Sequence, residues 1–328
     1  MVWPQSLHTV SGPFDQARID GAAAGMGEHG PATRALIDDG GLSPDLLCGL
    51  TLLLLARQPR PEPARNRDSA RDGEDGDGVA DGDSEGVNKL EDASPIAGGV
   101  WVREQFAVHR PLDRFDPFTV EGSATGRFVR KGRRYGVTSS RTRDSAGNHV
   151  ATNLTCGLLS YRADAGADQV EGQSLDNTPG PVPDTSRAGR NPHLDALAQV
   201  RAGDRFGGRP LTLSLAMMAA RDTENPDNPI HSDPAAAKAA GLAVPIAGGS
   251  HVLSFALEPL LAAWGPESLQ HGAHFDIRWR APTEAGAEIV PAAEVTAATE
   301  QMLTVDLTVT LASGPTALVG TVTVPRSA

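Results

Sequence analysis

The sequence predicts an α+β protein built from two similar halves. A long apolar helix is expected at residues 46–56 in the first half and 250–263 in the second, each shortly after a Gly-Gly pair. Each helix is followed by segments in which apolar and polar residues alternate, most clearly at 303–311. Such alternation predicts strands with one buried face. The repeated order of one helix and several strands predicts a helix wrapped by an antiparallel sheet, twice.

The elements follow in the same order in both halves. In the first, Ser43 is a good N-cap and Pro44 suits the first turn of the helix Leu46–Ala56. A helix wrapped by a curved sheet is the hot-dog architecture, so a double hot-dog is predicted, although the alternation alone also fits other α+β folds. Strands are expected at 105–112, 119–125, 133–141 and 150–161, and again at 274–282, 288–297, 303–312 and 316–324.

Three regions are expected along the chain. The N-terminal repeat spans residues 1–162, a polar, Pro-rich linker spans 163–194, and the C-terminal repeat spans 195–328. Within the first repeat, residues 60–95 hold a strongly acidic segment with almost no large apolar side chains. It is expected to be disordered, because it buries too little apolar surface to offset its ordering entropy. Its Asp75–Asp81 spacing partly matches a calcium loop but lacks the final glutamate, so solvated low complexity is the preferred interpretation.

Composition and charge exclude several classes of function. The net charge of −12 argues against nucleic acid or an anionic membrane surface as partner. No signal peptide is recognisable, and the longest apolar run, Leu46–Ala56, is shorter than the roughly 20 residues of a membrane-spanning helix. Cys48 and Cys156 lie in apolar surroundings, which is typical of buried, reduced thiols in a cytoplasmic protein.

One segment of the C-terminal repeat carries residues that suggest chemistry. Asn228-Pro229-Ile230-His231-Ser232-Asp233-Pro234 precedes Ala239-Ala240-Gly241 and the turn Val244–Ser250. This segment resembles the active-site region of MaoC-like (R)-specific enoyl-CoA hydratases and dehydratases, in which Asp-x-Asn-Pro-Ile/Leu-His leads into a Pro-Ile-x-His-Gly turn. Val200–Phe206 is similar to the opening strand of that family. The resemblance covers about residues 198–326, and it reaches the first repeat only through the internal similarity.

The resemblance implies a hydro-lyase with His231 as catalytic histidine and Asn228 holding the loop or the water. Gly249 and Ser250, at a helix start, are implied to bind the thioester oxygen there through backbone N–H groups. Hydration of an α,β-unsaturated thioester needs a base for water, an acid for the α-carbon and donors for the thioester oxygen, which these residue types supply. No metal or organic cofactor is expected.

The segment departs from the family pattern at two positions. The family's catalytic aspartate lies five residues before the histidine, where this chain has Pro226. Asp227 is preferred as its substitute because it is near in sequence, and Asp222 remains the alternative, since it would align if the loop carried an insertion. The family's histidine before the turn glycine is Gly248 here, which is expected to enlarge the tunnel or to alter how the helix start is held.

Other polar residues have less specific interpretations. Asp233 is expected to cap a helix at 235–240, while His251, His271 and His274 are expected at the surface or in packing. One group of basic residues is expected either to be solvated or to contact CoA phosphates: Arg130, Lys131, Arg133, Arg134, Arg278 and Arg280.

The predicted reaction is the reversible syn hydration of a trans-2-enoyl-CoA, or of an acyl-carrier-protein thioester, to the (R)-3-hydroxyacyl product. The first repeat has no Asn-Pro-Ile-His segment, so one site per chain is expected, in a monomer that acts as a pseudo-dimer or in a homodimer of double hot-dogs. Two alternatives remain open. One is a non-catalytic acyl-CoA-binding protein, favoured by Pro226. The other, less favoured, is a hot-dog thioesterase, for which the helix after Gly249 offers only the carboxylate of Glu258.

Overall fold

The two repeats are described by a computed structural model that covers most of the chain. The acidic segment 60–95, Pro226 and Asp227 lie outside the described residues, as does most of the range assigned to the linker. Val170–Gly172, within that range, forms strand β7 and pairs with β4 (Phe118–Arg130). The described residues are 4–7, 9–56, 100–160, 170–172, 174, 180–181, 191–222, 228–265 and 267–326.

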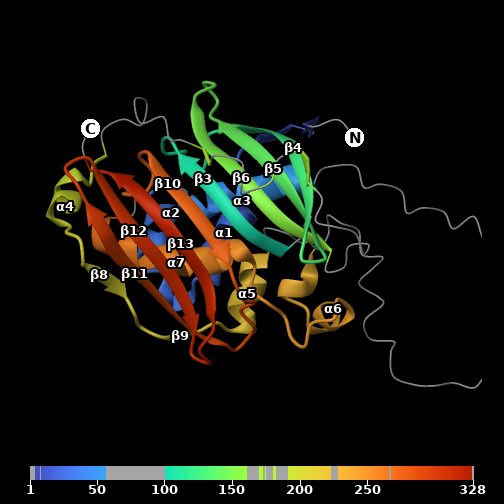
Figure 1. Cartoon of the computed structure of the whole chain (residues 1–328). Helices are drawn as coiled ribbons and strands as arrows, with labels where there is room; N and C mark the ends of the chain where they lie inside the picture. Colours follow the sequence, from blue (N-terminus) through green and yellow to red (C-terminus); the bar gives the residue numbers. More distant parts are fainter. Residues whose placement is uncertain are drawn as a thin grey trace, which may run out of the picture.

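The long strands of both repeats form one antiparallel sheet (Figure 1). Among the described residues its strand order is β1-β4-β5-β6-β3-β10-β13-β12-β11-β8, so the repeats meet where β3 pairs with β10. Every strand expected from the alternation is present, with ends shifted by a few residues. The long strands are β3 (Val100–Val108), β4 (Phe118–Arg130), β5 (Arg133–Arg143), β6 (His149–Ser160), β10 (Ala273–Trp279), β11 (Glu288–Ala298), β12 (Met302–Leu311) and β13 (Thr316–Pro325).

The two long helices lie behind the sheet in the view of Figure 1. The two predicted apolar helices are α3 (Pro44–Ala56) and α7 (Gly249–Trp264). The shorter helices are α1 (Gln16–Gly25), η1 (Gly27–His29), α2 (Pro31–Asp38), α4 (Leu194–Gln199), α5 (Leu215–Arg221), η5 (Pro229–His231) and α6 (Pro234–Ala239). The short strands are β1 (Gln5–Ser6), β2 (Val10–Gly12), β8 (Arg205–Gly207) and β9 (Leu211–Thr212).

The junction of the repeats is a packed part of the core. Phe106 of β3 is in register with Phe275 of β10, and their rings stack with centroids 4.1 Å apart. Both side chains are fully buried. Aromatic pairs of this kind contribute about 1 kcal/mol beyond their buried area. The sheet is therefore continuous across the two repeats, as a double hot-dog requires.

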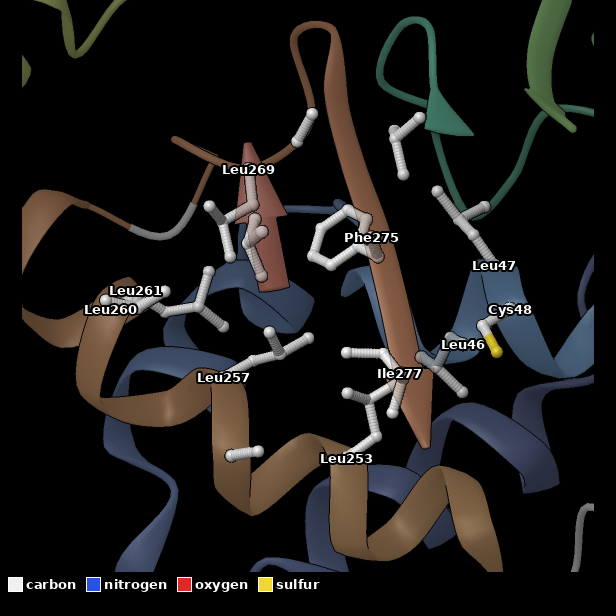
Figure 2. Packing of buried hydrophobic residues seen from close by; sticks show 14 of the residues in the cluster. Leu46, Leu47, Cys48, Leu253, Leu257, Leu260, Leu261, Leu269, Phe275 and Ile277 are labelled. Carbon is white, nitrogen blue, oxygen red and sulfur yellow. The ribbon is translucent and has the colours of Figure 1, made fainter. Parts of the chain in front are cut away.

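Both long helices place leucines on the inner face of this sheet (Figure 2). Leu46 of α3 and Leu253 and Leu257 of α7 point into the space beside Phe275 and Ile277 of β10. All five side chains are fully buried, and each large apolar side chain removed from water contributes roughly 1.5–3 kcal/mol. One core therefore joins the helices of both repeats.

Helix α3 begins where the sequence predicts, but with a different cap. The backbone carbonyl of Ser43 accepts from Leu46 N–H at 3.0 Å, whereas the Ser43 hydroxyl has no hydrogen-bond partner among the described residues. The expected side-chain cap is therefore wrong, and Pro44 at the first helical position starts the helix. Within the described ranges, no helix is long and apolar enough to cross a membrane.

Candidate active site

The segment that resembles the hydratase motif folds as a short helical loop between α5 and α7. Asn228 precedes the 3-10 turn η5, which ends at His231. Asp233 then caps α6 as predicted, because its carboxylate accepts from Ala235 N–H at 2.7 Å. After α6 the chain turns back through Ile246 to the start of α7. These short elements hold His231 close to the first turn of α7.

His231 is fixed in one orientation by the turn that follows α6. Its Nδ1 lies 2.7 Å from the carbonyl oxygen of Ile246. Because a carbonyl only accepts, Nδ1 carries the proton, and neutral His231 has its lone pair on Nε2. The amide nitrogen of Asn228 lies 3.4 Å from Nε2, at the weak end of hydrogen bonding. His231 therefore presents a basic nitrogen that is hydrogen-bonded to Asn228.

Gly248 leaves space on the side of this basic nitrogen. A Cβ atom at Gly248 would meet one neighbour within 4 Å among the described residues, His231 Nε2 at 4.0 Å. A larger side chain at this position, such as the histidine of the resembled pattern, would have to pass beside that atom. The glycine therefore keeps the approach to His231 Nε2 open.

The first turn of α7 is held tightly by two tryptophans. A Cβ at Gly249 would lie 3.1 Å from Trp279 and 3.2 Å from Trp101, so a side chain at Gly249 would force these rings to move. Trp279 Nε1 also donates to the Gly249 carbonyl at 3.1 Å. The first intrahelical hydrogen bond runs from Val252 N–H to the Gly248 carbonyl. The N–H groups before Val252 have no intrahelical acceptor and lie at the positive end of the helix dipole.

Of the two candidate carboxylates, Asp222 is described and Asp227 lies outside the described residues. Asp222 directly follows α5 and accepts a short hydrogen bond from the hydroxyl of Ser232. Ser232 is the residue after His231. This contact therefore ties the carboxylate at the end of α5 to the histidine loop.

A cavity of about 700 Å³ collects the described candidate residues. This volume lies in the range of small-molecule sites. His231, Asn228, Asp222, Gly249 and Ser250 all line it. Its wall also contains the ring pair Trp101 and Trp279, whose centroids are 5.4 Å apart, and which sequence reasoning missed. Trp279 lies on the strand expected at 274–282, whereas Trp101 precedes the strand expected at 105–112, so no sequence pattern pointed to this pair.

Basic side chains from both repeats line the same cavity. The hairpin between β4 and β5 in the first repeat contributes three of them, and β10 with the residue that follows it contributes two. Arg103 of β3 lies between these groups and is ion-paired with Asp276 at 2.6 Å. Arg134, which the sequence placed with the hairpin group, is not among the lining residues. Arg221 of α5, which is ion-paired with Asp45 at 2.7 Å, also lines it. The lining cations are Arg103, Arg130, Lys131, Arg133, Arg221, Arg278 and Arg280.

Of the nearby histidines, His251 is a packing residue. It is buried, and its Nε2 lies 2.8 Å from the Gly25 carbonyl in α1. Burial lowers the pKa of His251 to about 3, so it is neutral at physiological pH. His274 is partly buried, and burial lowers its pKa as well. Neither provides a second exposed base, and the described residues contain no group of His, Cys, Asp and Glu side chains that could hold a metal ion.

Comparisons with known proteins identify the fold. A solved "MaoC-like dehydratase" is 19% identical with a TM-score of 0.62, and 97% of each chain is covered. A conserved Mycobacterium tuberculosis protein with a double hot-dog fold is 15% identical with a TM-score of 0.58, covering 98% of this chain and 96% of that one. The peroxisomal multifunctional enzyme type 2 of Drosophila melanogaster is 14% identical with a TM-score of 0.59. That match covers 98% of this chain and 48% of the Drosophila chain.

The chain is thus a double hot-dog protein, as the sequence predicts. Residues 210–313 match the sequence model described as "MaoC like domain". The C-terminal repeat therefore carries a MaoC-like domain, which contains the His231 loop and the start of α7. No curated protein matches the sequence.

Proposed function

We propose that this protein is a hydro-lyase that adds water to, or removes it from, an α,β-unsaturated acyl thioester. The observation that carries the proposal is the position of His231 Nε2 on the same cavity as the start of α7. One feature is a base and the other an electropositive helix end, and both are needed for this chemistry. The MaoC-like domain that spans them supports the same class of reaction.

In the hydration direction water displaces the weak 3.4 Å contact between the Asn228 amide and His231 Nε2. His231 Nε2 then takes a proton from this water as the water oxygen bonds to C3 of the substrate. The C2–C3 π electrons move toward the thioester carbonyl, whose oxygen gains negative charge. Gly249 N–H at the start of α7 stabilises that charge. A carboxylic acid then delivers a proton to C2, which completes the addition. The proton taken up by His231 returns to the resulting carboxylate through solvent, so that one water is added and both groups regain their starting states. Dehydration follows the same steps in reverse.

For the carboxylic acid we choose Asp222, with Asp227 as the alternative. Asp222 lines the cavity and is hydrogen-bonded to Ser232, next to His231. Proximity in sequence had instead favoured Asp227 over Asp222. Sequence distance is a weak guide here, because α5 and the histidine loop are brought together by the fold and not by chain neighbourhood.

The substrate carrier is proposed to be anionic, as CoA or the phosphopantetheine arm of an acyl-carrier protein. The chain is acidic, with a net charge of −12, yet seven cationic side chains line this one cavity. Arginine and lysine suit phosphate groups through charge and hydrogen bonding. The product in the hydration direction is proposed to be the (R)-3-hydroxyacyl thioester, as the resemblance of the loop implies.

The thioesterase alternative has less support, because Glu258 is already engaged. Its Oε1 accepts from Ala32 N–H at 2.7 Å, and its Oε2 accepts from Thr33 N–H at 3.0 Å and from the Thr33 hydroxyl at 2.6 Å. Glu258 thereby caps α2 of the first repeat, and it does not line the cavity. The helix carboxylate that hydrolysis would require is thus used for packing. The support for the non-catalytic alternative is still Pro226, which stands where the resembled pattern has its catalytic aspartate. A measurement of turnover distinguishes this alternative from the proposed hydro-lyase.

The test supplies crotonyl-CoA and longer trans-2-enoyl-CoAs and identifies the products by mass. A product that gains one water while the thioester stays intact supports the proposal. Release of free CoA would instead support a thioesterase. Binding without any turnover, at every chain length, would support the acyl-CoA-binding protein.

A further inference from the structure

Asp45 of the first repeat contacts the elements on both sides of the candidate active site. Its Oδ2 atom accepts from Arg221 Nη2 at 2.7 Å and from the Ser254 hydroxyl at 2.7 Å. Arg221 ends α5 immediately before Asp222, and Ser254 lies in α7 one turn after Ser250. We propose that Asp45 is a positioning residue of the active site, which holds the Asp222 end of α5 and the first turns of α7 in register. This inference rests on the proposed hydratase function.

The contact to α5 is a buried ion pair with little freedom to move. The side chain of Arg221 is 4% exposed and that of Asp45 is 1% exposed. Helix α1 closes the other side of Arg221, since a Cβ atom at Gly25 would come within 2.8 Å of Arg221 Cβ. The backbone that leads into Asp222 is therefore held by two elements of the first repeat.

The contact to α7 fixes the helix start that is proposed to receive the thioester oxygen. The single hydroxyl hydrogen of Ser254 is best assigned to Asp45, because the alternative acceptor, the Ser250 carbonyl, is farther away at 3.0 Å. A bond to a carboxylate is also stronger than one to a carbonyl. His251 adds a second tie to the first repeat through the Gly25 carbonyl at 2.8 Å. Asp45 thus acts on Gly249 through α7 and on Asp222 through Arg221.

Physical considerations favour positioning over stability as the role of this ion pair. Desolvation of two buried charges offsets much of their attraction, so such a pair adds little folding free energy compared with an apolar pair of the same size. What it does fix is geometry, because a carboxylate oxygen shared by two donors restrains both of them. A displacement of about 1 Å in an active site lowers turnover by about a hundredfold. The repeat that lacks the hydratase motif therefore contributes to catalysis through Asp45.

The test compares Asp45→Asn with Glu258→Gln in the full-length protein. Both substitutions alter a buried contact between the repeats, but Glu258 contacts Ala32 and Thr33 and does not line the cavity. With folded protein confirmed by circular dichroism, Asp45→Asn is expected to lower kcat by about 10- to 100-fold with KM within about threefold. Glu258→Gln is expected to keep kcat within about twofold while lowering the unfolding midpoint. Ser254→Ala removes one hydrogen bond and keeps the ion pair, so its kcat is expected to lie between those of the other two variants. It replaces Asp45→Asn in the test if Asp45→Asn does not fold.

Amide hydrogen exchange gives a second measurement that does not require turnover. Asp45→Asn is expected to speed exchange in α5 and in the first turns of α7, whereas Glu258→Gln is expected to speed it in α2. Equal loss of kcat in both variants, or unchanged exchange in α5 and α7 of Asp45→Asn, would overturn the inference. A wild-type protein that hydrates no enoyl thioester overturns the proposed function instead, and hydrogen exchange then still decides whether Asp45 holds the two segments.

Discussion

At the residue scale, the two candidate carboxylates, Asp222 and Asp227, lead to distinct predictions. Asp222 lines the cavity and accepts a hydrogen bond from Ser232, so we expect Asp222→Asn to lower kcat by roughly 10²- to 10⁴-fold, the usual contribution of a general acid or base. Asp227→Asn, made as the matched control, is expected to keep most activity. Steady-state kinetics with one enoyl thioester measures both variants. The reverse result, with Asp227→Asn the inactive one, would assign the acid to Asp227.

Gly249 and its neighbour Gly248 provide a second residue-scale prediction. An alanine Cβ at Gly249 would lie 3.1 Å from Trp279 and 3.2 Å from Trp101, whereas one at Gly248 would meet nothing closer than His231 at 4.0 Å. Overpacking of this kind costs roughly 1–3 kcal/mol, so Gly249→Ala should destabilise the fold by that amount. Gly248→Ala should change stability by less than about 0.5 kcal/mol. Urea unfolding measures the stability of both variants. Equal stabilities would show that the rings of Trp101 and Trp279 move aside at little cost.

At the scale of elements, His251 links α7 to α1 and makes the contact sensitive to acid. Its pKa is lowered from 6.5 to about 3, first by burial and then by the charge of Arg221. An unfolded chain therefore binds this proton more readily than the native one. The stabilisation of the folded state by neutral His251 is therefore complete above pH 6.5, and it is lost as the pH falls toward 3.

The change predicted from this linkage is large enough to measure. Between pH 6.5 and about pH 4 the wild-type protein should lose roughly 3 kcal/mol through His251. His251→Gln keeps a donor for the Gly25 carbonyl but does not titrate, so its stability should fall less over the same range. Urea unfolding at the two pH values gives the difference. Parallel pH dependence in the two proteins would contradict a buried, neutral His251.

At the scale of the whole molecule, one sheet and one core join the two repeats. Phe106 and Phe275 stack across the junction, and Glu258 and Asp45 make further buried contacts between the halves. We therefore expect a single cooperative unfolding transition. Tryptophan fluorescence and far-ultraviolet circular dichroism should give coincident midpoints in urea. Two separated transitions would show that the repeats fold independently.

Much of this architecture could be predicted because its signals are local. The apolar run Leu46–Ala56 and the strict alternation at 303–311 specify their elements without help from the rest of the chain. Helix α1 could not be predicted in this way, because it is rich in Ala and Gly, and α2 has only eight residues. Both helices are stabilised by contacts with the other repeat. Glu258 of α7, for example, caps the first turn of α2.

The residues of the candidate site also fall into those that a local pattern predicts and those that only the fold brings together. His231, Asn228 and Gly249 lie within one short motif, so sequence spacing was enough to find them. Asp45 and Arg221 are 176 positions apart, and only the folded chain brings them together. The same holds for the cavity cations, which come from strands of both repeats. Contacts between repeats leave no local pattern in the sequence.

The central claim is that His231 acts as the base of a hydratase. The most direct measurement follows the loss of enoyl absorbance from crotonyl-CoA and longer enoyl-CoAs, with wild-type protein and His231→Ala at matched folded concentrations. We expect turnover by the wild-type protein and a fall of roughly 10²- to 10⁴-fold in kcat for His231→Ala, with acyl-CoA binding retained. Equal rates in the two proteins, or no turnover by the wild-type protein at any chain length, would contradict the claim.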